Sequence, residues 1–145
     1  MGLALRGLGL CLALSLLGGC AVGLKDVFND RELLKDTQRE FSQYLRWGAI
    51  EKASQFVVPE QRPEFEALAP HLTDLRFTDY EVLQVKQLSE TEAQVTVRYR
   101  GYSLSSPIER SITLDQQWTR ESDKGPWMVR LEVRRLREAL GMAAG

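Results

Sequence analysis

Few side chains in this 145-residue sequence have the type and spacing that chemistry requires. The sequence has one histidine, His71, and two cysteines, Cys11 and Cys20. A zinc site usually needs four nitrogen, sulfur or oxygen ligands, and an activated Ser or Cys usually needs a histidine beside it. No Gly-rich phosphate loop, nucleophile elbow or calcium-loop spacing occurs either. The sequence therefore predicts no metal site and no cofactor.

His71 is the natural candidate for a general base, but nothing around it supports that role. It follows Pro70 in a segment that we expect to be a loop. Asp74 and Asp79 are close in sequence, yet no motif turns their carboxyl groups toward the imidazole. A solvent-facing or helix-capping histidine is the simpler interpretation, and we assign no catalytic residue.

Cys20 is different, because the residues before it form a pattern. One positive charge, Arg6, precedes an apolar run over residues 8–17. A run of about ten residues is too short to cross a bilayer, which needs about twenty, but it suits a signal peptide. The run ends in Leu17-Gly18-Gly19-Cys20, which resembles the lipobox of bacterial lipoproteins. The resemblance implies cleavage before Cys20, a diacylglycerol on its sulfur and usually a third acyl chain.

The cysteine count agrees with a lipid anchor. Cys11 lies in the segment that cleavage would remove, so Cys20 is the single thiol of the mature chain and no intramolecular disulfide is possible. A secretory signal peptide cut elsewhere and a transmembrane anchor are the alternatives. Myristoylation is disfavoured, because Arg6 occupies the position that needs Ser or Thr. The predicted partner is the membrane, contacted through lipid.

The residue after Cys20 bears on the destination. In enterobacteria-like lipoprotein sorting, Asp at this position retains the protein in the inner membrane, and other residues usually allow transfer. Ala21 therefore favours the periplasmic face of the outer membrane. Of the 19 basic residues only Arg6 lies in the signal peptide, which leaves 18 against 20 acidic residues. This slightly acidic balance argues against a nucleic-acid partner.

Removing residues 1–19 from 145 leaves 126, which suits one domain. We expect a short tether over 20–28 and a domain over 29–145. Helical spacing of apolar residues predicts three helices. They cover 29–48, with a capping box of Asn29 and Glu32, then 50–59, and then 60–68 before Pro70.

After His71 the apolar period changes to two, which predicts four strands. They cover about 75–85, 93–100, 108–119 and 127–133. The alternation of apolar residues in the first strand shifts by one position, which predicts a β-bulge at Thr78 and Asp79. Ser122-Asp123-Lys124-Gly125 predicts a turn before the last strand. A basic segment, 134–140, closes the chain.

Three amino-terminal helices followed by a four-stranded antiparallel sheet make an α+β domain. The pattern resembles the NTF2-like superfamily, in which a bent sheet curls round the helices into a cone. The matching features are the helix junction at 47–53, the bulged first strand and the two long final strands with their tryptophans. The resemblance implies a pocket between the helices and the concave face of the sheet.

Four side chains on inward strand positions are the candidates for that pocket: Tyr99, Arg110, Gln116 and Trp118. Enzymes of this superfamily need a pocket Asp or an Asp/His pair as base, which these positions do not supply. Arg110 could hold an anionic ligand, or it could reach solvent with its stem buried. Trp118 and the other aromatic residues could line a pocket or fill the core.

Two functions follow from these patterns. The first is a non-enzymatic binding or scaffolding module, anchored by lipid and facing the periplasm, with a cell-envelope protein as its partner. The second is a small-molecule binder or enzyme that uses the cone pocket. On the surface, we expect Arg98 and Arg100 to lie across from Asp115 or Glu132, unless they form a partner surface. The closing basic segment could contact anionic head groups or be a solvated helix end.

Overall fold

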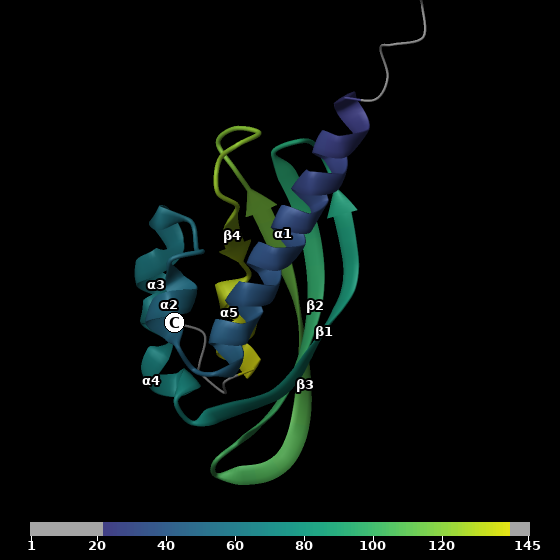
Figure 1. The fold of residues 1–145 in the computed structure, drawn as a ribbon. Helices are drawn as coiled ribbons and strands as arrows, with labels where there is room; N and C mark the ends of the chain where they lie inside the picture. Colours follow the sequence, from purple (N-terminus) through teal and green to yellow (C-terminus); the bar gives the residue numbers. More distant parts are fainter. Residues whose placement is uncertain (1–21, 140–145) are drawn as a thin grey trace, which may run out of the picture.

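The computed structural model describes residues 22–139, so the expected signal peptide, Cys20 and Ala21 lie outside the described residues. The helical elements are α1 (Val22–Arg46), α2 (Ile50–Ser54), the 3-10 helix η1 (Pro59–Gln61), α3 (Arg62–Glu66), α4 (Ala69–Leu72) and α5 (Val133–Ala139). The strands are β1 (Leu75–Gln87), β2 (Glu92–Ser103), β3 (Ser106–Thr119) and β4 (Met128–Leu131). The helices and a curved antiparallel sheet pack as two layers (Figure 1).

The expected α+β class and the four-stranded antiparallel sheet are confirmed, but the helices differ from the prediction. Helix α1 begins at Val22, not at Asn29. The residues before Asn29 contain no proline, and each residue added to an existing helix gains one hydrogen bond, so the helix extends toward the amino terminus. It ends as expected at the turn formed by Gly48, which has a positive φ of 68°.

The region between α1 and the sheet forms short helical pieces instead of two longer helices. Pro63 and Pro70 each occupy the first turn of a helix, α3 and α4. A proline lacks the N–H that an interior position must donate, but the first turn leaves its N–H groups unbonded anyway. Pro70 therefore begins a helix where we expected it to end one.

The sheet has the order β1-β2-β3-β4. The register of β1 on β2 shifts between Phe77 and Asp79, which confirms the expected bulge, and shifts again between Val82 and Gln84. Gly101 pairs with Phe77 at the first bulge, and a Cβ atom there would lie 2.6 Å from the carbonyl oxygen of Arg76. The curvature of the sheet at this point therefore requires glycine.

The helices cover one face of the sheet and form the core with it. Phe41 of α1 packs edge-on against Trp118 of β3, with 5.9 Å between ring centroids, and also contacts Phe65 of α3. All three side chains are fully buried. Trp47 does not join this core; its ring is exposed and lies against the guanidinium of Arg46.

The opposite face of the sheet is a polar ladder. Arg98 pairs with Glu81 at 3.5 Å and Arg100 with Asp79 at 2.9 Å, both on β1. The expected partners were wrong: Asp115 of β3 lies across from Thr96 and accepts a hydrogen bond from its hydroxyl, and Glu132 lies after the end of β4, outside the sheet.

The final strand is shorter than expected, because residues from Val133 onward form α5. Val133 and Leu136 are buried. Arg134 lies 3.8 Å from Glu138, and Arg135 lies 3.4 Å from Glu132, so these two arginines of the closing segment pair with carboxylates. Gly125 donates to the carbonyl of Ser122, which confirms the expected turn before β4.

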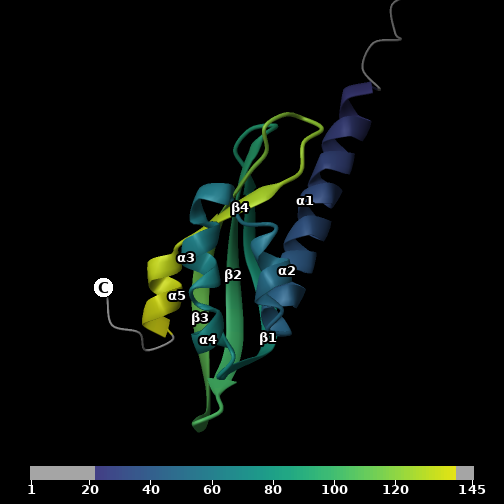
Figure 2. The same cartoon turned by 90° about the vertical axis from the view of Figure 1, so that its left-hand side faces the viewer.

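The long helix diverges from the sheet toward its amino-terminal end (Figure 2). That end lies on the same side of the molecule as the β1–β2 hairpin and the β3–β4 loop, and the β2–β3 hairpin lies at the opposite end (Figure 1). Within the described chain, no helix combines the length and apolarity that a membrane crossing requires.

Candidate functional site

Three of the four predicted pocket residues lie together inside the domain. Trp118 Nε1 donates to Gln116 Oε1 at 3.1 Å, and Gln116 Nε2 donates to the Tyr99 hydroxyl at 2.9 Å. The Tyr99 hydroxyl lies 2.7 Å from Ser42 Oγ, which accepts from Gln38 Nε2 at 2.8 Å. All five side chains are buried. We call this chain of hydrogen bonds, which joins β3 and β2 to α1, the buried polar chain.

The hydrogens of the buried polar chain determine its direction. Ser42 and Tyr99 share one bond, so within residues 22–139 one of their two hydroxyl hydrogens has no acceptor. A 180° rotation of the Gln38 carboxamide exchanges its oxygen and nitrogen at almost the same shape. Ser42 can then donate to Gln38 and Tyr99 to Ser42. In that arrangement the four bonds run in one direction, each group from Trp118 to Ser42 donates to the next, and Gln38 is the last acceptor.

Tyr99 is a neutral hydrogen-bonding group in this environment. Burial raises its pKa far above the ordinary value near 10, although its bonds to Ser42 and Gln116 act in the opposite direction. The folded protein therefore keeps the phenol proton under conditions in which an unfolded chain would lose it.

The raised pKa predicts a loss of stability in alkali. Below pH 10 both states hold the proton, and above it the unfolded state binds fewer protons than the native state, so stability falls as pH rises, by up to about 1.4 kcal/mol per pH unit. Urea denaturation at about pH 9 and about pH 11 should therefore show a smaller loss for Tyr99→Phe than for the wild type. Tyr102→Phe, at an exposed position, should lose as much as the wild type. Equal losses in the two variants would contradict the assignment.

The fourth predicted pocket residue does not join this chain. Arg110 is exposed on β3, where it pairs with Gly101 of β2 near the β2–β3 hairpin. His71, Asp74 and Asp79 are also exposed, and Asp79 is the partner of Arg100. Among residues 22–139, no group of three His, Cys, Asp or Glu side chains could hold a metal ion.

Arg120 is a buried charge that the sequence interpretation missed. Its guanidinium contacts both carboxylate oxygens of Asp30, at 2.9 and 3.3 Å. It also donates to the carbonyl oxygens of Glu90 and Asp123 and lies 4.6 Å from the centre of the Trp127 ring. The side chain is fully buried, and all five of its N–H groups have partners. Leu114, Gln116 and Trp118 point inward at every second position of β3, and Arg120 is the next residue in this alternation. This spacing is the signal that could have identified Arg120 as buried.

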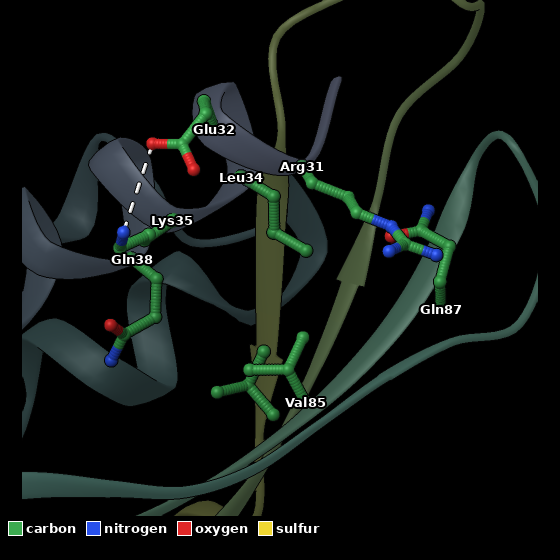
Figure 3. Close-up of a pocket in the computed structure, with 8 residues that line it drawn as sticks. Arg31, Glu32, Leu34, Lys35, Gln38, Val85 and Gln87 are labelled. Carbon is green, nitrogen blue, oxygen red and sulfur yellow. Dashed lines mark ion pairs between the residues drawn. The ribbon is translucent and has the colours of Figure 1, made fainter. Parts of the chain in front are cut away.

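A groove lies where α1 diverges from the sheet (Figure 3). Its volume is about 320 Å³. Its lining residues come from α1, β1 and β2: Arg31, Glu32, Leu34, Lys35, Gln38, Val85, Gln87 and Val95. Gln38 belongs both to this groove and to the buried polar chain. No sequence pattern marks the groove, because it depends on the angle between α1 and the strands.

Comparison with solved structures identifies the kind of fold. A SEC-C motif-containing protein from Psychrobacter arcticus aligns with a TM-score of 0.54 at 13% identity, over 66% of this chain and 57% of that one. A ketosteroid isomerase-like protein from Erwinia carotovora atroseptica aligns with a TM-score of 0.53 at 12% identity, over 68% and 88%. The fold is therefore similar to that of a ketosteroid isomerase-like protein. An NTF2-like protein from Shewanella oneidensis aligns with a TM-score of 0.46 at 16% identity, over 74% and 94%.

These alignments concern the fold, because every identity is below about one residue in six. The chain spans 57% of the length of the Psychrobacter protein. No protein-family description matches this sequence, and no curated protein does.

Proposed function

We propose that this protein is a lipid-anchored lipoprotein of the bacterial cell envelope, whose NTF2-like domain faces the periplasm and acts as a non-enzymatic binding or scaffolding module. The observation that carries the proposal is Leu17-Gly18-Gly19-Cys20 behind a short apolar run, with Cys20 as the single cysteine after cleavage. Two or three acyl chains hold a protein on a membrane durably, whereas one chain holds it only marginally. Ala21 favours the outer membrane as the destination.

The chemistry of the interior supports binding over catalysis. The buried polar side chains are amides, hydroxyls and the guanidinium of Arg120, and among residues 30–139 no carboxyl or imidazole group is buried. A general base must reach its substrate with a pKa near the working pH, and the raised pKa of Tyr99 keeps this phenol protonated. Phe41 and Trp118 fill the interior that the alternative of a cone-pocket enzyme would need.

The position of the anchor would orient the domain. Helix α1 begins two residues after Cys20, so the end of the molecule with the β1–β2 hairpin would face the lipid. The β2–β3 hairpin would then point away from the membrane, toward envelope partners. Crosslinking in cells followed by mass spectrometry tests for such a partner, and a scaffold should return the same protein repeatedly.

Replacing Cys20 by alanine should abolish both palmitate incorporation and cleavage of the signal peptide, because the thiol is the acceptor of the diacylglycerol. Radiolabelled palmitate and the mass of the protein measure the two steps. Cys11→Ala is the matched control and should be labelled and processed as the wild type is. Undiminished labelling of Cys20→Ala would overturn the anchor.

A further inference from the structure

The groove between α1 and β1 has an aliphatic floor that the described chain leaves open. Leu34 of α1 and Val95 of β2 are buried beneath it, whereas Val85, the register partner of Val95, is 57% exposed. Val82 pairs with the buried Val97 in the same way and is also exposed. Both β1 side chains therefore lie on the face of the sheet that the helices cover elsewhere. Val85 is left uncovered where α1 diverges from the sheet (Figure 3).

The groove also has polar residues at its ends. Arg31 and Lys35 are one helical turn apart on α1, on the same side as Leu34, and both line the groove. Glu32 lies 3.7 Å from Lys35, but both side chains are about two-thirds exposed, and a surface pair of this kind is weak. Gln38 and Gln87 add amides. The charged residues of the lining therefore leave one net positive charge beside an apolar floor.

We propose that this groove binds a long-chain fatty acid, with its acyl chain over Leu34, Val85 and Val95 and its carboxylate near Arg31 and Lys35. The lining is aliphatic, which suits an alkyl chain, and it offers no aromatic ring on which a planar ligand could stack. Its volume of about 320 Å³ is at the small end of ligand sites and suits one chain better than two. A carboxylate complements the two basic side chains.

The source of the ligand rests on the proposed function. The groove lies along the middle of α1, and its first lining residue, Arg31, is eleven residues from Cys20, or about 16 Å along a helix. An anchored protein would therefore hold the groove next to the membrane, from which free fatty acids can exchange.

The test uses the full mature lipoprotein, reconstituted in vesicles of phosphatidylethanolamine and phosphatidylglycerol. A palmitic acid that carries a diazirine and an alkyne is added and irradiated, and the labelled peptides are identified by mass spectrometry. The label should fall within residues 31–38 and 82–95, and unlabelled palmitate should compete. Label confined to other segments, or labelling by a photoactivatable phosphatidylglycerol but not by the fatty acid, would overturn the proposal.

Variants test the two parts of the site separately. Val85→Asp should reduce labelling about tenfold or more, because the acyl chain would desolvate the new carboxylate. Ile108→Asp, at an exposed aliphatic position on β3 near the opposite hairpin, should not change it. Arg31→Glu with Lys35→Glu should reduce labelling by the fatty acid but not by a fatty alcohol probe of equal length. Undiminished labelling of Val85→Asp, with a melting temperature close to that of the wild type, overturns the acyl site.

The mass of the protein reports lipid on Cys20 independently of the groove. A lipidated protein without label in the groove overturns the fatty-acid site alone. A labelled groove in a protein without lipid on Cys20 overturns the anchor alone.

Discussion

Replacing Arg120 by alanine should lower the free energy of unfolding by about 3 kcal/mol, the low end of the range observed when one partner of a buried ion pair is removed, because the Asp30 side chain is 30% exposed. The guanidinium is fully buried and joins three parts of the chain that are distant in sequence. These are Asp30 on α1, the β1–β2 hairpin at Glu90 and the β3–β4 loop at Asp123. Its loss would leave the Asp30 carboxylate unpaired and two loop carbonyls without donors, and it would remove a cation from the face of Trp127.

Chemical denaturation monitored by circular dichroism measures this effect. Arg130→Ala is the matched control, because Arg130 is half-exposed on β4 and lies 3.8 Å from Glu60 in a surface pair. Such pairs contribute about 0–1 kcal/mol, so the control should differ little from the wild type. A double-mutant cycle with Asp30→Ala separates the ion pair from the loop contacts. A loss below about 1 kcal/mol for Arg120→Ala would show that the five bonds contribute little net stability.

Arg120 illustrates what the sequence could and could not show. The alternation along β3 put Gln116 and Trp118 on the inward face, and both are buried. Arg120 continues the same phase one residue beyond the strand, but a terminal arginine is usually interpreted as solvated. Its partner Asp30 is ninety residues earlier, and no local pattern connects the two. Alternation predicts which face a residue occupies, and tertiary packing decides what it contacts.

The helical half shows a different limit. Gly48 marked the end of α1 correctly, because a positive φ is a local property of the backbone. The predicted start of α1 was wrong. Asn29 and Glu32 have the residue types and spacing of a capping box, but both lie inside a helix that begins at Val22. The groove beside α1 could not be predicted at all. It depends on the angle at which a helix leaves a sheet, and that angle comes from packing along the whole interface.

Replacing Gln116 by leucine should lower the free energy of unfolding by about 2–4 kcal/mol, although the two side chains have similar volumes. The change removes the acceptor of the Trp118 N–H and the donor to the Tyr99 hydroxyl. Each buried polar group left without a partner costs about 1–3 kcal/mol, and water cannot replace the lost bonds where Gln116 is completely buried. The same substitution would be nearly neutral at the surface.

The neighbouring residue provides that comparison, because Gln117 has the same side chain on the exposed face of β3. Gln117→Leu should change stability by less than about 0.5 kcal/mol. Denaturation in urea gives both values, and the near-ultraviolet circular dichroism of Trp118 should change only in Gln116→Leu.

Equal stabilities of the two variants would mean that the buried polar chain tolerates an apolar side chain at position 116. A large difference would mean that its bonds fix α1 on the sheet, because the chain continues through Tyr99 to Ser42 and Gln38 of that helix. Since Gln38 also lines the groove, the same bonds would hold in place the helix wall against which we expect the fatty acid to bind.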